Sequence, residues 1–197
     1  AHAGNDHRLG ANEAPPAIIS IFLGEQLTDV VDNIVSGTAA KSEKRKDTMR
    51  LGVTALPPLP RDATDRNRTS PFAFTGNKFE FRAVGSGQPI QMPNVFLNVA
   101  VAEALDEVAA RLEKLGKGGK GKGDATAAIL SLAGEVYKES KAVVYDGDNY
   151  GEAWVKEAAK RGLPNHRDAP AALAIYADED ARKFLAARGI FQPHEMD

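Results

Sequence analysis

Cysteine is absent from the 197-residue sequence, which excludes disulfides, thiolate metal ligands and cysteine nucleophiles. No apolar run approaches the roughly 20 residues that a helix needs to cross a bilayer. The polar N-terminus also lacks the apolar segment of a signal peptide. The formal net charge is only −2, so the composition does not indicate a protein that binds nucleic acid or a membrane surface. We therefore expect neither nucleic acid nor membrane among its partners.

The composition is that of an ordinary globular protein. Hydrophobic residues make up 43% of the sequence and charged residues 26%, which allows a core of reasonable size. The length fits one domain or one and a half. The chain has no initiator methionine, and it stops just after a helical pattern. We expect it to be a piece of a longer protein.

The first half of the chain combines short strands with polar loops. A β-branched apolar run predicts a buried strand over 17–23, and apolar residues at helical spacing predict a following helix that ends at Gly37. Another strand is expected over 49–56. Residues 72–81 alternate and contain aromatics, which predicts a strand or a hairpin with residues 75–77 as its turn.

The second half is expected to be entirely helical. A long helix should begin near Pro93. Its apolar face should comprise Val95, Val99, Ala102, Leu105, Val108 and Leu112. A Gly/Lys-rich linker over 116–123 should follow, because its composition is of low complexity. The linker is not a Walker A loop, since Lys122 is followed by glycine and no strand precedes it.

Asp124 should cap the next helix. The inward side chains of that helix are predicted to be Ile129, Leu132, Val136 and Tyr137. Three more helices are expected over 152–161, 169–177 and 178–188. The predicted fold class is therefore α+β, with antiparallel strands in the N-terminal half and a helical C-terminal half.

Three charged clusters lie in the first 82 residues. Arg8 and Glu13 belong to a Gly-rich loop, a setting that holds substrates more often than cores do. Residues 65–70, Asp-Arg-Asn-Arg-Thr-Ser, are rich in groups that bind anions. In the third cluster, strand alternation would place Lys78, Glu80 and Arg82 on one face and the neighbouring phenylalanines on the other.

A carboxylate displayed between two cations suits phosphoryl transfer. Arginine or lysine neutralises the oxygens of the transferred group, and carboxylates hold the divalent ion. Glu80 is a candidate ligand because Mg²⁺ and Mn²⁺ favour oxygen. Each cluster alone also has a purely structural interpretation, such as a salt-bridge ladder. The basic cluster at 41–50 is interpreted as a solvated loop, and Trp154 as helix packing.

The order of these clusters resembles glutamine synthetase. Arg8-Leu9 with Glu13-Ala14-Pro15 is similar to the family's Arg-Leu and Glu-Ala-Pro loop. Asn67-Arg68-Thr69-Ser70 resembles its Asn-Arg segment, and Glu80-Phe81-Arg82 resembles its Glu-Phe-Arg strand. The sequences of residues 5–16, 65–72 and 75–82 are similar to those of the type III branch, and the resemblance extends over essentially the whole chain.

The resemblance implies ligation of ammonia to the γ-carboxyl of glutamate, with ATP, through a γ-glutamyl phosphate. It implies catalytic roles for Glu13, on a flap that handles ammonium, and for Arg68, at the transferred phosphate. Arg8 and Arg82 would bind substrate, Lys78 would lie near the nucleotide, and Glu80 would bind Mg²⁺ or Mn²⁺. A cytoplasmic homo-oligomer is implied for the parent protein.

The resemblance also divides the chain. Residues 1–115 would be the C-terminal part of the catalytic domain, with residues 24–60 as an insertion. Residues 124–197, after the linker, would be an incomplete helical region. The family's other metal ligands and its nucleotide-binding segment lie outside these 197 residues, so we expect no synthetase activity from the chain alone. A γ-glutamyl–amine ligase and a non-catalytic interaction module stay open as alternatives.

Overall fold

The computed structural model describes residues 7–8, 11–12, 18–38, 48–49, 52, 57, 59–60, 70–82, 89–118, 125–166 and 168–196. These residues form a mixed, helix-dominated structure with one small three-stranded sheet. The chain divides into two compact units. One comprises residues 20–82 and 111–146, and the other comprises 1–19, 83–110 and 147–197. No helix among the described residues is both long and apolar enough to span a membrane.

The sheet of the first unit consists of β3 (Ile21–Phe22), β6 (Phe72–Phe74) and β7 (Phe79–Phe81), in the order β3-β6-β7. β6 and β7 are antiparallel, but β3 runs parallel to β6. This parallel pair corrects the prediction of antiparallel strands. The physical reason is that β3 leads into helix α1 (Gly24–Ser36), and a crossover of that length lets the chain return in the same direction.

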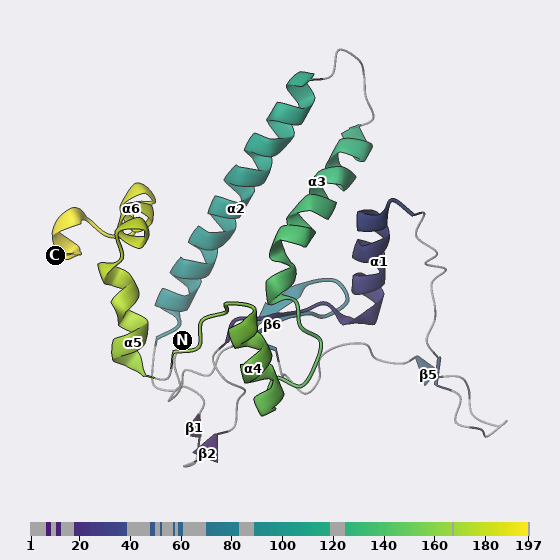
Figure 1. Cartoon of the computed structure of the whole chain (residues 1–197), viewed down its shortest axis with the longest axis horizontal. Helices are drawn as coiled ribbons and strands as arrows, with labels where there is room; N and C mark the ends of the chain where they lie inside the picture. Colours follow the sequence, from purple (N-terminus) through teal and green to yellow (C-terminus); the bar gives the residue numbers. More distant parts are fainter. Residues whose placement is uncertain are drawn as a thin grey trace. The chain divides into compact units, whose positions relative to one another are not determined.

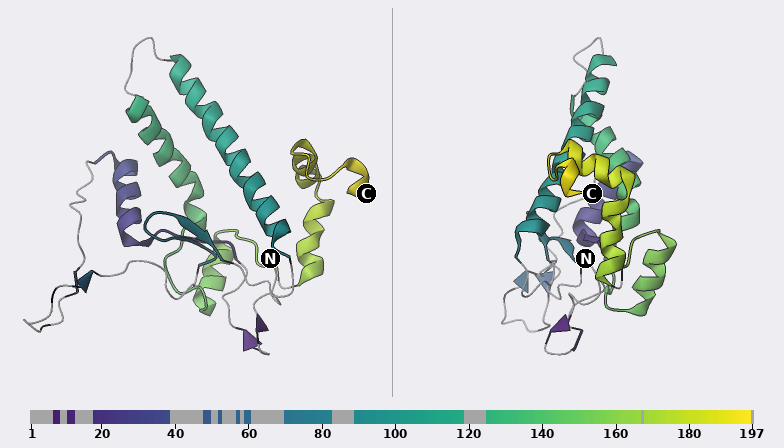
Figure 2. Two further views of the ribbon diagram at one scale, coloured as in Figure 1. Left: turned by 180° about the vertical axis from the view of Figure 1, so that it is seen from behind. Right: turned by 90° about the vertical axis from the view of Figure 1, so that its left-hand side faces the viewer.

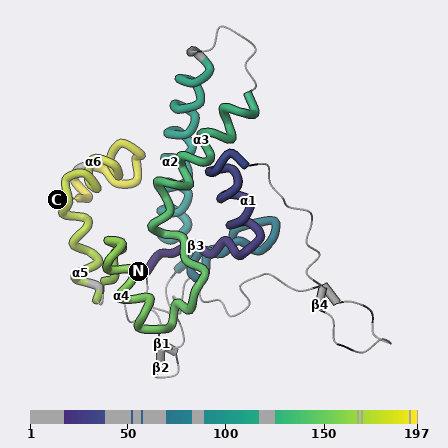
Figure 3. The backbone as a smooth tube through the Cα atoms, turned by 45° about the vertical axis from the view of Figure 1, so that its right-hand side comes forward, coloured from purple at the N-terminus to yellow at the C-terminus, as the bar shows by residue number. Residues whose placement is uncertain are grey.

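Helices α1 and α3 (Ala125–Ser140) pack against each other, as Figures 1 and 3 show from two directions. Gly134 of α3 lies close to α1. A Cβ built on it would be 3.7 Å from Cγ2 of Ile34 and from Cα of Val35. Leu132 is only 3% exposed. The predicted inward position of Ile129 is wrong, since its side chain is 53% exposed. The reason is that the N-terminal turns of α3 extend past α1 (Figure 1).

The long helix is α2 (Gln91–Gly118), which begins near Pro93 as predicted and includes the first residues of the predicted linker. Its predicted apolar face is only partly covered, since Leu105 is 62% exposed. Its contacts with the C-terminal helices are made by other residues: Phe96 faces the ring of Tyr176, and Glu103 and Asp106 bind Arg188.

The C-terminal helices of the second unit are α4 (Glu152–Lys160), α5 (Ala169–Leu173), the 3₁₀ helix η2 (Ala174–Ala177), α6 (Glu179–Ala187) and the 3₁₀ helix η3 (Pro193–Glu195). We call them the helical tail, which Figure 2 shows in green to yellow. Asp168 and Asp178 cap α5 and α6 by accepting backbone N–H bonds. Trp154 is fully buried, which confirms its interpretation as helix packing.

Two short strand pairs and one 3₁₀ helix complete the described structure. The pairs β1 (His7–Arg8) with β2 (Ala11–Asn12), and β4 (Thr48–Met49) with β5 (Leu59–Pro60), are antiparallel. The 3₁₀ helix η1 (Lys141–Val143) follows α3. The predicted strand over 17–23 is represented by the short β3. Most of the predicted strand over 49–56 lies outside the described residues, and only Met49 of it belongs to β4. The Asp124 cap and most of the basic cluster at 41–50 lie outside the described residues.

Candidate functional site

The β6–β7 hairpin carries the candidate site, and it forms where the alternation of residues 72–81 predicts it. The Thr75 amide donates to the Lys78 carbonyl oxygen at 2.8 Å, which closes the turn. Gly76 in this turn has a φ of 89°, a conformation that residues with a Cβ rarely adopt. Beyond the hairpin, the Arg82 amide donates to the carbonyl oxygen of Pro71 at 2.6 Å.

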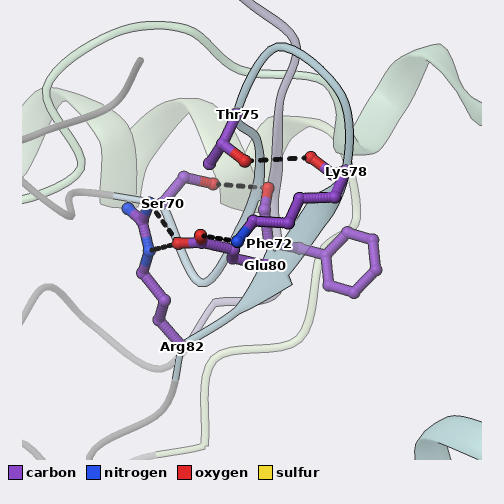
Figure 4. Close-up of polar contacts among 6 residues, drawn as sticks. All are labelled: Ser70, Phe72, Thr75, Lys78, Glu80 and Arg82. Carbon is purple, nitrogen blue, oxygen red and sulfur yellow. Dashed lines mark hydrogen bonds and ion pairs between the residues drawn. The ribbon is translucent and has the colours of Figure 1, made fainter.

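Lys78, Glu80 and Arg82 share one face of β7, as predicted, and we call them the charged face (Figure 4). Lys78 Nζ lies 3.1 Å from Glu80 Oε1, and Arg82 Nη2 lies 3.0 Å from Glu80 Oε2. Arg82 Nε also donates to Oε2, at 3.3 Å. The hydrogen bonds from Arg82, and then from Lys78, lower the pKa of the Glu80 carboxyl below its ordinary value of 4.5. The carboxylate is therefore ionised at neutral pH.

The opposite face of the hairpin is aromatic. The ring of Phe72 stacks on that of Phe79 with centroids 5.4 Å apart and also contacts Phe81 at 6.1 Å. Phe74 contacts Phe79 at 5.3 Å. These contacts confirm the predicted separation into a charged and a packed face. The packing is incomplete, since Phe79 is 46% exposed.

The other predicted site residues are not brought into this arrangement by the described structure. Arg8 pairs with Ala11 in the two-residue strands β1 and β2, where a loop was expected. Residues 8 and 11 are only three positions apart in the sequence, a separation at which the ends of two antiparallel strands can pair. Glu13 and Arg68 lie outside the described residues. Their predicted roles therefore stay predictions.

A divalent ion finds one suitable ligand on the charged face. Glu80 is an ionised oxygen donor whose side chain is 38% exposed, which fits Mg²⁺ or Mn²⁺. Within the described part of the chain, however, no group of three or more His, Cys, Asp or Glu side chains could hold a metal ion. The described residues therefore fit one ligand of such a site and not the whole of it.

Two polar contacts hold the sheet that carries the charged face. Buried Ser70 donates from Oγ to the carbonyl oxygen of Ser20 at 3.1 Å. Asp146 accepts hydrogen bonds from the amides of Leu23 and Gly24, at 2.9 and 3.3 Å. The contact of Asp146 with β3 was not predicted, because no local pattern signals a contact between residues 123 positions apart.

Comparison with known proteins shows what the chain is similar to. Residues 128–197 match the family model described as "Glutamine synthetase C-terminal domain". The chain is 46% identical over 196 residues to a glutamine synthetase of Bacteroides fragilis (strain YCH46). It is 44% identical over 198 residues to a type-3 glutamine synthetase of Dictyostelium discoideum.

Each of these two alignments covers 98% of this chain but 26% of the relative. A glutamine synthetase of Butyrivibrio fibrisolvens is 39% identical over 204 residues, with 27% of its length covered. The chain therefore spans about a quarter of the length of these relatives. The resemblance that the motifs predicted is confirmed: the chain is similar to part of each of these glutamine synthetases, a type-3 enzyme among them, and residues 128–197 match the model of the family's C-terminal domain.

Proposed function

We propose that the chain is the C-terminal part of the catalytic region of an ATP-dependent glutamate–ammonia ligase, which we call the complete enzyme. In this proposal the charged face forms one edge of its phosphoryl-transfer site. The observation that carries the proposal is the ionised Glu80 carboxylate, held between Lys78 and Arg82 on a partly exposed strand. Among the described residues, two cations lie beside this one anion, an arrangement that favours a phosphate or a substrate carboxylate.

Each residue of the charged face has a distinct task in this proposal. Arg82 binds phosphate or substrate carboxylate through its planar fork of donors. Lys78, 64% exposed, is free to swing toward the nucleotide because its stem is long and flexible. Glu80 contributes one oxygen ligand to Mg²⁺ or Mn²⁺. When bound, such an ion neutralises charge on the phosphate oxygens.

The remaining roles rest on the sequence resemblance. Glu13 would handle ammonium, Arg68 would contact the transferred phosphate, and Arg8 would hold the glutamate substrate. The same resemblance supports a homo-oligomeric cytoplasmic enzyme, in which residues 24–60 are an insertion and 116–123 a linker. In the structure α1 lies within that insertion and packs on α3, so we propose that the insertion stabilises the C-terminal domain.

The test is Glu80→Gln in the complete enzyme. Loss of a charged ligand should raise the Mg²⁺ concentration needed for half-maximal activity at least about 100-fold. The matched control is Glu139→Gln, because Glu139 also pairs with an arginine, Arg111, at 2.9 Å. The control should keep the wild-type requirement for Mg²⁺. Equal responses of the two variants would contradict the proposal.

One observation favours a second candidate, a non-catalytic module in which the charged face is structural. Both oxygens of Glu80 already have partners within the hairpin, as a salt-bridge ladder requires. Under this alternative, Glu80→Gln and Glu139→Gln would change stability alone. Measuring the Mg²⁺ requirement and the unfolding midpoint of both variants therefore separates the two functions.

A further inference from the structure

The strand that supports the candidate site is itself held from the far side by residues 144–146. Strand β3 lies between β6 and this segment: Ile21 pairs with Phe72 on one side and forms a parallel bridge with Val144 on the other. The Tyr145 amide donates to the carbonyl oxygen of Ile21 at 2.9 Å. Residues 144–146 therefore extend the three-stranded sheet by a short segment beside β3.

Asp146 makes the strongest part of this attachment. Its Oδ1 accepts from the amides of Leu23 and Gly24, and its Oδ2 accepts from Thr28 Oγ1 at 3.2 Å. The two backbone donors lie at the N-terminus of α1, where N–H groups lack helical partners and favour a negative charge. Gly24 has a φ of 77°, a turn that a residue with a Cβ would strain. The chain thus bends sharply from β3 into α1 over the Asp146 carboxylate.

The register of the sheet connects this attachment to Glu80. Phe22 pairs with Ala73, and Ala73 pairs with Glu80, so the three residues form one row across the strands. Ala73 is fully buried and Leu23, next to Phe22, is 9% exposed. Because interior packing is dense and strand spacing is fixed by hydrogen bonds, a displacement of β3 must be followed by β6 and β7.

We propose that Asp146 is a positioning residue for Glu80, acting through β3 and β6. The inference rests on the proposed function, because it takes Glu80 as a metal ligand. Lys78 and Arg82 orient the carboxylate of Glu80 from within its own hairpin. Asp146 instead sets the place of the whole strand, together with the Ser20–Ser70 contact on the side of β6.

Asp146→Ala in the complete enzyme tests this inference. It should raise the Mg²⁺ concentration for half-maximal activity about tenfold. A merely structural role would lower the amount of folded enzyme and leave the Mg²⁺ requirement of the folded molecules unchanged. The matched control is Asp148→Ala, because Asp148 Oδ1 accepts a local hydrogen bond from the Tyr150 amide, at 2.9 Å. The control should behave as the wild type.

Two milder variants extend the series. Asp146→Asn keeps an oxygen that can accept from Leu23 and Gly24, so it should restore most of the Mg²⁺ response. Thr28→Val removes one hydrogen bond to Asp146 and should raise the Mg²⁺ requirement about twofold. Thr28→Val provides the same test if Asp146→Ala does not fold, and a wild-type response of Thr28→Val would then count against the inference.

Hydrogen exchange supplies a readout that is independent of activity and of added metal. Peptides covering residues 70–82 should exchange faster in Asp146→Ala than in Asp148→Ala. Asp146→Ala could show the hydrogen exchange and the Mg²⁺ requirement of the wild type while Glu80→Gln shows a raised Mg²⁺ requirement. This outcome would overturn only the role of Asp146. A wild-type Mg²⁺ response in Glu80→Gln would overturn the proposed function, and this inference with it.

Discussion

Arginine–carboxylate pairs occur both in the β6–β7 hairpin and in the contact between α2 and the helical tail. The two clusters differ in the ratio of cations to carboxylates. On the hairpin, one carboxylate, Glu80, lies between two cations. Between α2 and the tail, one guanidinium, that of Arg188, lies between two carboxylates, Glu103 and Asp106, the latter at 2.7 Å. Among the described residues, the first cluster therefore contains more positive than negative groups, and the second contains more negative than positive groups.

Separation along the chain explains what each cluster can contribute. The residues of the charged face are two positions apart, so their pairing adds no contact between distant parts of the fold. Arg188 is 82 and 85 positions from its partners, so its pairing joins two elements. In the proposed function the hairpin cluster binds anions, whereas the Arg188 cluster joins two elements of the fold.

The largest expected effect is on stability and lies in the helical tail. Trp154 is fully buried, with the Arg161 guanidinium 5.5 Å from its ring centroid. Trp154→Ala should lower the free energy of unfolding of the chain by about 3–5 kcal/mol, through lost burial and a new cavity. Urea unfolding followed by circular dichroism measures this. Trp154→Phe is the control, and a loss below about 1 kcal/mol in the alanine variant would contradict the packing argument.

The next effect concerns catalysis and sets the two arginines against each other. Arg82→Met in the complete enzyme should reduce kcat/KM about 100-fold, because a charged donor to phosphate or carboxylate is lost. Arg188→Met should leave kcat/KM within about threefold of the wild type, since the proposed function gives Arg188 no contact with substrate and a partly exposed ion pair contributes little. Steady-state assays at saturating Mg²⁺ measure both. A comparable loss in the two variants would break the distinction between the clusters.

A smaller effect concerns stability, where Arg188 should matter more than Arg82. In the isolated chain, Arg188→Met should lower the urea midpoint more than Arg82→Met does, because Arg188 joins α2 to the helical tail, whereas Arg82 pairs with Glu80 two positions away. High salt should narrow the difference, since both clusters are partly exposed and ions screen them. Unfolding curves at low and high ionic strength provide the measurement. The opposite ranking would assign the structural role to the hairpin.

The smallest effect is a pH dependence in the tail. The hydrogen bond from Arg161 lowers the pKa of the Glu157 carboxyl below its ordinary value of 4.5. A lowered pKa stabilises the folded state, fully above pH 4.5 and progressively less as the pH falls through the folded pKa. The Tm of the wild type should therefore exceed that of Glu157→Gln above pH 4.5, and the gap should close in acid. A difference in Tm between the two proteins that does not change with pH would show that the Glu157–Arg161 ion pair does not cause it.

Local patterns predicted the elements that local physics determines. Alternation over residues 72–81, with Gly76 in the turn, predicted both the hairpin and the common face of Lys78, Glu80 and Arg82. Helical spacing predicted α1 as far as Gly37, and glycines in the tail marked the ends of α4 and α6. In each case the determining residues lie within a few positions of one another.

Features that depend on distant partners could not be predicted in the same way. The parallel pairing of β3 with β6 and the exposure of Leu105 depend on which elements meet, and the sequence around them does not encode this choice. The Asp146 contact shows the same limit, because an isolated Asp after a helix resembles any surface carboxylate. The chemical meaning of the charged face came from the order of motifs along the chain and not from any one cluster.

The attachment of residues 144–146 to β3 has a consequence for biosynthesis. Leu23 and Asp146 are separated by 123 positions, so the first strand of the sheet leaves the ribosome long before its last neighbour. At roughly 5–20 residues per second, this interval is roughly 6–25 s. During that time β3 has an unpaired edge of the kind that recruits foreign strands. The nascent chain therefore passes through a period in which a chaperone that covers this edge would raise the yield of folded protein.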